Sequence, residues 1–278
     1  MTYELRKQDT SSSATDHVAL TRDCELLEAA VRDAGALALS LFRTELKSWI
    51  KGASSPVSEA DIAANDLLRM RLEQVSPDYG WLSEESTDEF ARLDREKVWI
   101  VDPIDGTRSF LAGRDDWCVS AALVERGVPI VGVVFAPASD ECFVAVNGRG
   151  AALNGKPVTA TPGHAIEVPR LAGPKPLIER LLSSGHDAVP HPRIGSLALR
   201  LCRVAEGRID AAFAGGASKD WDLAAADLIV HEAGGRITSL AGEPLIYNLR
   251  DVTHGILVAA GYERHAHIVE HFRNRPLS

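Results

Sequence analysis

The sequence predicts a mixed α and β fold, because helical and strand patterns occupy different parts of the chain. Two long stretches with apolar residues at helical spacing come first, and short apolar runs typical of strands follow up to about residue 146. After a Pro- and Gly-rich stretch at 155–174, helical and strand patterns alternate toward the C-terminus. The 278 residues suffice for one large domain or for two packed halves.

Two helices are predicted before the first long strand. Apolar residues recur with helical spacing over 18–42, which predicts a long first helix. Residues 51–56 contain Gly, Ser and Pro and break this pattern, so a second helix is expected from Ser58 to about residue 77. Residues 1–16 are polar and lack either periodicity, and we expect them to form a disordered tail.

Short apolar runs then predict the strands of an antiparallel sheet. Glu125-Arg-Gly127 joins two alternating runs at 117–124 and 129–135, which is a hairpin signal. Further strands are expected at 80–82, 98–101 and 142–146.

The second half of the chain alternates helix and strand. Its helices are predicted at about 175–184, 196–206, 221–233 and 262–273, and its strands near 189–194, 209–214, 235–239 and 254–260. We therefore divide the chain into an N-terminal half at 17–155 and a C-terminal half at 156–278. The two halves are expected to form one catalytic unit with the active site between them.

The composition excludes several kinds of function. The 39 acidic and 30 basic residues give a formal net charge of -9, which argues against binding to nucleic-acid polymers or to membrane surfaces. Four cysteines without a CxxC pair indicate neither a disulfide framework nor a thiolate zinc site. The sequence has no signal-peptide pattern and no uninterrupted apolar run of about 18 residues, so we expect a cytoplasmic protein.

The most informative segment is Asp102-Pro-Ile-Asp-Gly-Thr107, which follows an apolar run at 98–101. Pro103 lacks an amide hydrogen, so the strand is expected to stop at Asp102 and to present that carboxylate at the sheet edge. The amides from Gly106 onward would open a short helix whose positive end favours an oxyanion. Taken alone, the same residues also fit an ordinary Asp-Gly turn.

Three further acidic positions could converge on this loop. Asp61 lies at the start of the second helix, where the helix dipole alone favours a carboxylate. Glu84 and Glu85 follow a short strand and could form a solvated turn, and Asp222 begins an apolar helix that it could cap. Together these oxygen donors, without Cys or His spacing for a metal, suit Mg²⁺ rather than zinc.

Four motifs occur in a fixed order: Pro56-Val-Ser-Glu-Ala-Asp61, Ser83-Glu-Glu-Ser86, Trp99-Ile-Val-Asp-Pro-Ile-Asp-Gly-Thr107 and Trp221-Asp-Leu-Ala-Ala225. With them the chain resembles the inositol monophosphatase superfamily of Mg²⁺-dependent, lithium-sensitive phosphatases, from about residue 25 to 260. The resemblance implies a layered αβαβα sandwich and inhibition by lithium. A homodimer is common in the family.

The resemblance also implies roles for individual residues. The metal ligands would be Glu84, Asp102, the Ile104 carbonyl, Asp105 and Asp222, with Asp61 holding a third, weaker ion. Asp102 would bridge two Mg²⁺ ions. The catalytic residues would be Asp61, Glu84 and Thr107, of which Thr107 and Asp61 would position the attacking water. The amides of Gly106 and Thr107 would bind phosphate oxygens.

The substrate is left open by the sequence. Details around 82–85 and 194–207 resemble the 3'(2'),5'-bisphosphate nucleotidase branch, which converts adenosine 3',5'-bisphosphate to AMP and phosphate. Gly215 stands where inositol-cleaving relatives often carry a Glu that contacts sugar hydroxyls. An inositol-1-monophosphatase, or another sugar or histidinol phosphate phosphatase, is the alternative, and a non-catalytic phosphate-binding regulator is an alternative of another class.

Four residues are expected to contact the variable part of this small-molecule substrate or a second phosphate: Gly195, Ser196, Arg200 and Lys219. Arg200 and Lys219 are the two candidates for the second phosphate. Arg200 could equally be a solvated helix residue, and Lys219 could serve only to offset the acidic loop.

Overall fold

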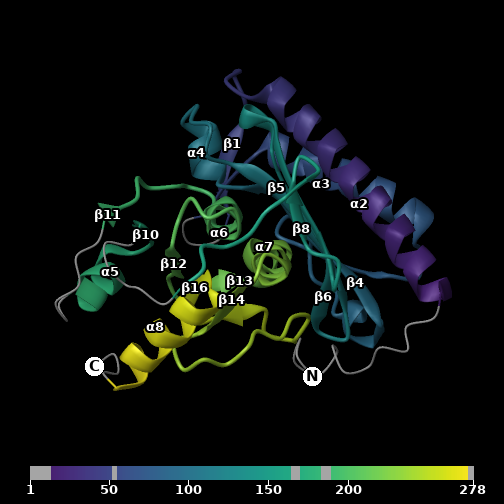
Figure 1. Cartoon of the computed structure of the whole chain (residues 1–278). Helices are drawn as coiled ribbons and strands as arrows, with labels where there is room; N and C mark the ends of the chain where they lie inside the picture. Colours follow the sequence, from purple (N-terminus) through teal and green to yellow (C-terminus); the bar gives the residue numbers. More distant parts are fainter. Residues whose placement is uncertain (1–13, 52–54, 164–169, 183–188, 275–278) are drawn as a thin grey trace.

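Five layers of secondary structure follow one another across the molecule, in the order helix, sheet, helix, sheet, helix (Figure 1). The computed structural model of the chain describes residues 14–51, 55–163, 170–182 and 189–274. Within these residues the predicted αβαβα sandwich is confirmed.

The helices of the described residues are α2 (Ala14–Leu41), α3 (Glu59–Val75), α4 (Thr107–Leu111), α5 (Lys175–Leu182), α6 (Leu197–Ala205), α7 (Asp220–Glu232) and α8 (Tyr262–Asn274), with short 3₁₀ helices η1 (Ala91–Asp94) and η2 (Pro137–Ser139). One sheet has the strand order β3 (Gly80–Ser83), β4 (Lys97–Asp105), β5 (Cys118–Glu125), β6 (Val128–Ala136), β7 (Glu141–Val146), β8 (Ala151–Leu153) and β9 (Lys156–Pro157). The other has the order β11 (Val189–Pro190), β10 (Arg170–Ala172), β12 (Ala211–Ala214), β16 (Leu257–Gly261) and β14 (Gly235–Ser239). Two small antiparallel pairs are β1 (Ser48–Lys51) with β2 (Ser55–Ser58), and β13 (Ser218–Lys219) with β15 (Thr253–His254).

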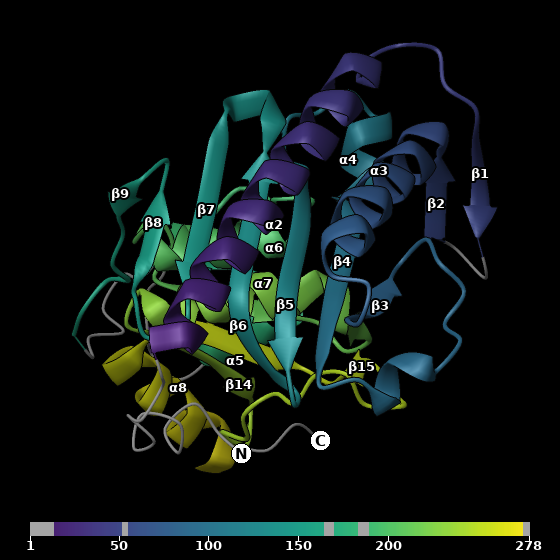
Figure 2. The ribbon, with the colours of Figure 1, turned by 90° about the vertical axis from the view of Figure 1, so that its right-hand side faces the viewer.

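The seven-stranded sheet is buried on both faces. Helices α2 and α3 lie across one face (Figure 2), and α6 and α7 pack on the other. Successive side chains of a strand point to opposite faces, so Trp99 and Val101 of β4 pack beneath α2 and α3, whereas Val98 and Ile100 pack toward α6 and α7. Burial on both faces explains why residues 98–101 of β4 are all apolar.

Helices α6 and α7 form the middle layer between the two sheets. A glycine in β6 lets α7 approach closely, because a Cβ at Gly132 would lie only 2.7 Å from the backbone oxygen of Ala225. Small residues of α7, including Ala224 and Ala226, are fully buried in the same core. The start of α7, which carries Asp222, is thereby fixed against the seven-stranded sheet.

The five-stranded sheet packs its other face against α5 and α8. Leu171 of β10, Phe213 of β12 and Val258 of β16 share this outer core with Ile268 and Phe272 of α8. Helices α5 and α8 thus form the fifth layer, on the outer side of the five-stranded sheet (Figure 1).

The expectation that the strand stops at Asp102 is wrong. Strand β4 continues to Asp105, and its pairing with β5 shifts register between Asp102 and Asp105. The irregularity accommodates Pro103, which has no amide to donate, and it re-aims the side chains around it. The Ile104 N–H donates to Asp102 Oδ1 at 3.0 Å, so one of the two carboxylates stabilises the irregular segment itself.

Several shorter elements differ from the expectations. The break expected at 51–56 contains parts of the β1–β2 hairpin, and β10 lies in the stretch interpreted as a connection. The strand expected at 189–194 is limited to β11, and that expected at 254–260 begins as β15 before β16. The first helix begins at Ala14, inside the expected tail, whose residues 1–13 lie outside the described residues. Among the described helices, none combines the length and the apolarity needed to cross a lipid bilayer. The division into halves at 155/156 stays a prediction.

Candidate active site

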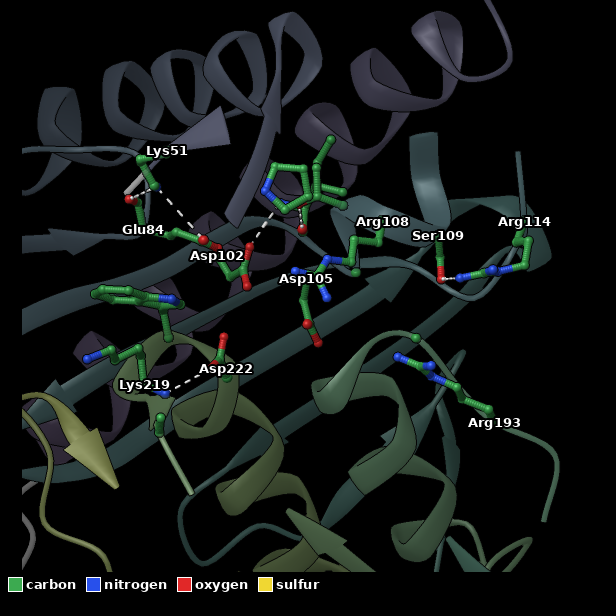
Figure 3. Close-up of a pocket in the computed structure, with 17 residues that line it drawn as sticks. Lys51, Glu84, Asp102, Asp105, Arg108, Ser109, Arg114, Arg193, Lys219 and Asp222 are labelled. Carbon is green, nitrogen blue, oxygen red and sulfur yellow. Dashed lines mark hydrogen bonds and ion pairs between the residues drawn. The ribbon is translucent and has the colours of Figure 1, made fainter. Parts of the chain in front are cut away.

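A cavity of about 680 Å³ lies where β3 and β4 end and where α4, α6 and α7 begin (Figure 3). Its charged lining residues are the acidic Glu84, Asp102, Asp105 and Asp222 and the basic Lys51, Arg108, Arg114, Arg193 and Lys219. Ile104, Gly106, Thr107 and Gly195 also line it. The cavity therefore combines carboxylate donors with cationic side chains and with backbone from the segment at 102–107.

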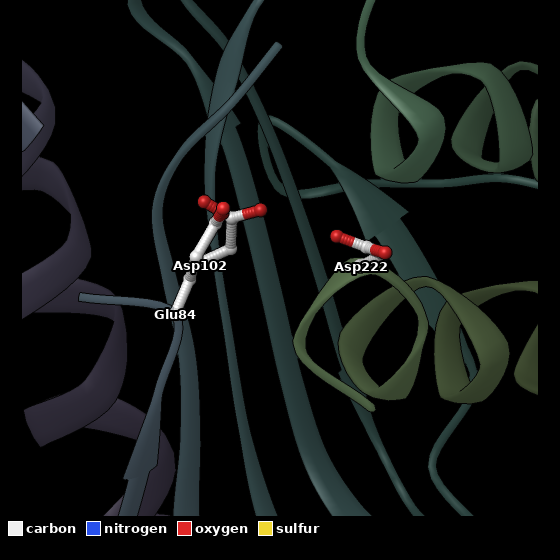
Figure 4. Close-up of side chains that lie close together, drawn as sticks. All are labelled: Glu84, Asp102 and Asp222. Carbon is white, nitrogen blue, oxygen red and sulfur yellow. The ribbon is translucent and has the colours of Figure 1, made fainter. Parts of the chain in front are cut away.

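Three carboxylates from distant parts of the chain meet in this cavity. Glu84 follows β3, Asp102 lies in β4 and Asp222 lies in the first turn of α7 (Figure 4). One oxygen from each of them lies within 4.8 Å of one oxygen from each of the others. Three oxygen donors at this spacing fit a hard divalent cation such as Mg²⁺.

Lys51 of the β1–β2 hairpin holds the segment that carries Glu84. Its Nζ donates to the Glu84 backbone oxygen at 2.6 Å and to Glu85 Oε1 at 2.9 Å, and it lies 3.8 Å from Glu84 Oε1. The Glu84 N–H donates to the Val101 carbonyl at 3.2 Å, beside Asp102. Lys51 thus pairs with both glutamates, more closely with Glu85, and Glu84 lines the cavity.

Two of the acidic residues share one local geometry at helix starts. Asp61 is the third residue of α3, and its Oδ2 accepts the Ser58 N–H at 2.8 Å and the Ser58 hydroxyl at 2.6 Å. Asp222 is the third residue of α7, and its Oδ2 accepts the Lys219 N–H at 2.7 Å. Capping therefore fixes the orientation of both carboxylates and uses only one oxygen of each.

Thr107, the first residue of α4, connects the segment after β4 to Asp61. Its Oγ1 lies 3.0 Å from Asp61 Oδ1 and 3.0 Å from the Ile104 carbonyl oxygen. The preceding Gly106 adopts φ 96°, and a Cβ there would lie 3.1 Å from the Asp116 carbonyl oxygen and 3.2 Å from the Ser196 nitrogen. Only glycine fits this conformation and spacing without strain, so Gly106 sets the position of Thr107.

Asp105 links β4 to the start of α6. Its Oδ2 accepts the Ser196 hydroxyl at 2.6 Å and the Ala198 N–H at 2.6 Å, while Ser196 Oγ in turn accepts the Leu199 N–H at 2.9 Å. Asp105 is 7 % exposed, so its carboxylate is nearly enclosed by this cap and the cavity. Asp105 thus joins the seven-stranded sheet to the middle helical layer.

The carboxylates of the site destabilise one another's charged forms. Burial raises the pKa of Glu84 to about 7; Lys51 opposes this shift, and Glu85, Asp105 and Asp61 add to it. Burial, followed by the neighbouring carboxylates, raises the pKa of Asp102 well above its usual value. Burial also raises the pKa of Asp222 well above its usual value, and Asp105 adds to that shift. A bound divalent cation would relieve this repulsion, so the donor set and its electrostatics both fit such an ion.

Not every residue expected in the site lines the cavity. Ser196 is fully buried beneath it and acts as the cap of α6. Arg200 lies on α6 outside the cavity lining, and within the described residues its buried Nε has no hydrogen-bond partner. Lys219 does line the cavity, and its Nζ donates to Thr253 Oγ1 at 2.5 Å.

Sequence reasoning missed four cationic lining residues: Lys51, Arg108, Arg114 and Arg193. Lys51 was hidden in a segment interpreted as a helix break. The three arginines carry no periodic or spacing signal, because isolated arginines are common on protein surfaces.

Comparisons with known proteins agree on one family. The sequence profile of the inositol monophosphatase family matches residues 20–277. Inositol monophosphatase 1 of Solanum lycopersicum is 37% identical over 206 residues, covering 69% of this chain and 75% of that protein. Nus factor SuhB of Pasteurella multocida is 34% identical over 230 residues, covering 78% of this chain and 82% of that protein.

A solved structure gives the same result for the fold. The crystal structure of the extragenic suppressor protein suhB from Bartonella henselae superposes with a TM-score of 0.79 at 27% identity. The superposition covers 92% of this chain and 100% of that one. The similarity therefore includes both sheets and the middle layer that carries Asp222.

Proposed function

This chain belongs to the inositol monophosphatase family of metal-dependent phosphatases, and on that premise we propose that it hydrolyses a small phosphate monoester by using a water positioned by Thr107 and Asp61. The observation that carries the proposal is the position of the Thr107–Asp61 pair, whose Oγ1 and Oδ1 lie 3.0 Å apart and whose threonine lines the same cavity as Glu84, Asp102 and Asp222.

Glu84, Asp102 and Asp222 would hold Mg²⁺, since their oxygens already lie within 4.8 Å of one another. The Ile104 carbonyl and Asp105 would complete two adjacent sites, and Asp61 would serve a third, weaker one. Bound Mg²⁺ would supply Lewis acidity, lowering the pKa of water and stabilising charge on the leaving oxygen.

The protein's own groups would orient the reacting water. A hydroxyl has one proton to donate, and Asp61 Oδ1 is the stronger acceptor of the two oxygens near Thr107 Oγ1. With its proton directed to Asp61, the Thr107 oxygen keeps lone pairs that can accept a hydrogen bond from water. Thr107 would therefore orient the nucleophile rather than act as one, and the amides of Gly106 and Thr107 would bind phosphate oxygens.

For the substrate we propose first adenosine 3',5'-bisphosphate, which would be cleaved at the 3'-phosphate. The three arginines in the cavity lining support a substrate with more than one phosphate, and Gly215 provides no acid for sugar hydroxyls. The second candidate is inositol 1-phosphate, which is supported by the names of the relatives that are 37% and 33% identical, inositol monophosphatase 1 and inositol-1-monophosphatase.

A substrate panel tests both parts of the proposal. Purified protein is given excess Mg²⁺, and phosphate release is measured from adenosine 3',5'-bisphosphate, inositol 1-phosphate and p-nitrophenyl phosphate. We expect Mg²⁺-dependent release that EDTA abolishes and that is fastest with the bisphosphate. Faster release from inositol 1-phosphate would reverse the order of the candidates. Phosphate binding without turnover would instead indicate the non-catalytic regulator.

Two properties carried by the family resemblance complete the proposal. Lithium should inhibit phosphate release by competing for one of the cation positions, and insensitivity at high millimolar concentration would contradict this. The homodimer is tested by light scattering of the purified protein, where the mass of one 29.9 kDa chain would contradict it.

A further inference from the structure

The charges that line the cavity are divided between two sides. Glu84, Asp102 and Asp222 lie on one side of Asp105, whereas Arg108, Arg114 and Arg193 lie on the other (Figure 3). Arg108 belongs to α4, Arg114 to the loop after α4, and Arg193 to the segment before α6. The arginine side thus forms a second, cationic part of the cavity next to the carboxylates.

Arg114 and Arg193 have few partners of opposite charge among the described residues. Arg114 donates to Ser109 Oγ at 2.8 Å and lies 3.4 Å from Asp116 Oδ1, while Asp116 Oδ2 accepts the Gly195 N–H. Within the described residues, Arg193 has neither a hydrogen-bond partner nor an ion-pair partner. Asp116 is therefore shared between Arg114 and a backbone amide, and Arg193 still lacks a counter-charge.

The loops that carry Arg114 and Arg193 are tightly joined. A Cβ at Gly195 would lie 2.0 Å from Ser109 Oγ and 3.0 Å from Asp116 Oδ2, so the two segments touch at this glycine. The Ser196 N–H also donates to the Asp116 carbonyl at 3.1 Å. The backbones are therefore positioned before any ligand binds, which lowers the entropy cost of binding between the two arginines.

The neutral hydroxyls of a polyol monophosphate would offer no counter-charge to Arg193. Guanidinium groups match phosphate oxygens in geometry and charge, and their hydrogen bonds to anions are among the stronger ones in proteins. The cavity volume of about 680 Å³ is within the range of small-molecule sites and exceeds what one phosphate requires.

We propose that Arg114 and Arg193, flanked by Arg108, bind a second phosphate group of the substrate, on the side of Asp105 opposite to the carboxylate cluster. This inference rests on the proposed phosphatase function and narrows its substrate to bisphosphates. It also moves the second phosphate away from Arg200 and Lys219, the two residues that the sequence suggested.

The test uses substrates that differ only in the second phosphate. Adenosine 3'-phosphate is compared with adenosine 3',5'-bisphosphate, and inositol 1-phosphate with inositol 1,4-bisphosphate, so that the scaffold is varied independently. The variants are Arg193→Gln, Arg114→Gln and the charge-preserving Arg193→Lys. The matched control is Arg126→Gln in the β5–β6 turn, where Arg126 is 70 % exposed and pairs with Glu96.

For the wild type we expect, in at least one of the two pairs, a kcat/KM that is at least ~10-fold higher for the bisphosphate than for the monophosphate. Arg193→Gln and Arg114→Gln should each lower kcat/KM for that bisphosphate by about 10- to 100-fold, chiefly through KM, and change the monophosphate value by less than about 3-fold. Arg193→Lys should lie between wild type and Arg193→Gln, and Arg126→Gln should match the wild type.

If the Arg114 and Arg193 variants lost kcat/KM equally for both members of a pair, the bisphosphate assignment would be overturned and the phosphatase function would remain. The same holds if the wild type preferred the monophosphates. Absence of Mg²⁺-dependent phosphate release from every substrate, including p-nitrophenyl phosphate, would overturn both. Thermal unfolding of each variant is measured alongside, and because Arg114 and Arg193 are exposed we expect midpoints near the wild-type value.

Discussion

Thr107 Oγ1 lies 3.0 Å from Asp61 Oδ1, so the first residue of α4 donates a hydrogen bond to a carboxylate in the first turn of α3. The other oxygen of Asp61 is occupied by the amide and hydroxyl of Ser58. The carboxylate therefore has a fixed orientation and imposes one on the Thr107 hydroxyl. If Thr107 orients the water, a hydroxyl is required at this position. Removing that hydroxyl should then lower activity without changing the overall fold.

Thr107→Ala should lower kcat by about 10²- to 10⁴-fold, because the water loses its acceptor. Thr107→Ser keeps the hydroxyl and should retain most of the activity. The measurement is steady-state phosphate release with Mg²⁺, with isothermal titration calorimetry to confirm that both variants bind the ion. Wild-type turnover by Thr107→Ala would contradict the role.

Asp222→Asn should make the metal-free protein more stable and remove its response to Mg²⁺. Burial and Asp105 raise the pKa of Asp222 in the folded chain, so the ionised carboxylate opposes folding. The metal-free protein therefore loses stability as the pH rises from the pKa of Asp222 in the unfolded chain to its higher pKa in the folded chain. The amide oxygen can still accept the Lys219 N–H that caps α7.

Thermal unfolding at pH 8 in EDTA and in Mg²⁺ provides the measurement for this variant. We expect the midpoint of Asp222→Asn in EDTA to exceed that of the wild type by a few degrees, for a gain of about 1–2 kcal/mol. The control is Asp33→Asn, since Asp33 is exposed and pairs with Arg71 on the outer helices. A Mg²⁺-induced rise equal to that of the wild type would argue against Asp222 as a ligand.

Mg²⁺ affinity should increase as the pH rises toward about 7, where Glu84 loses its proton. The pKa of Glu84 is raised to about 7 chiefly by burial, and an ion binds only the deprotonated carboxylate. Below that value the apparent dissociation constant should rise by up to ~10-fold per pH unit for one displaced proton. Calorimetric titrations at pH 6 and 8 measure the difference, and Glu84→Gln should reduce both the affinity and its pH dependence. Equal wild-type affinities at the two pH values would refute this linkage.

His265 should make the protein less stable in mild acid. Burial lowers the pKa of His265 to about 4, with Arg236 adding to the shift, and its Nε2 lies 2.9 Å from Thr238 Oγ1. Between pH 4 and the unfolded value near 6.5, the unfolded chain binds a proton that the folded protein does not, so stability falls as the pH falls through this window.

Urea unfolding of wild type and His265→Gln at pH 7.5 and pH 5 checks this prediction. On moving to pH 5, the wild type should lose about 2 kcal/mol more than the variant, because glutamine does not titrate. Parallel losses in the two proteins would show that His265 does not contribute to acid sensitivity.

The layered fold could be predicted from the sequence because burial imposes local periodicity. Val98 to Val101 are buried on alternate faces and give an uninterrupted apolar run, and the long helices carry apolar stripes. The β1–β2 hairpin could not be predicted, since Gly, Ser and Pro punctuate both hairpins and helix ends. The extension of β4 past Pro103 was missed because it depends on a register shift against β5, which is a tertiary feature.

The carboxylates were predictable because each belongs to a short local motif, although Asp102 lies inside β4 and not at its end. Glu84, Asp102 and Asp222 do meet in space. The cationic side was not predictable, because Arg114 and Arg193 come from separate loops and only the fold brings them to one cavity. Arg200 was chosen from sequence as a substrate contact, but its place on α6 leaves it outside the lining.

The most direct test of the account is the position of a bound divalent ion. Crystals grown with Mn²⁺, which shares the oxygen chemistry of Mg²⁺, would be measured at a wavelength where manganese scatters anomalously. We predict an anomalous peak within about 2.0–2.4 Å of carboxylate oxygens of Glu84, Asp102 and Asp222. A cluster that stays free of manganese while peaks occur at other carboxylates would contradict the central claim.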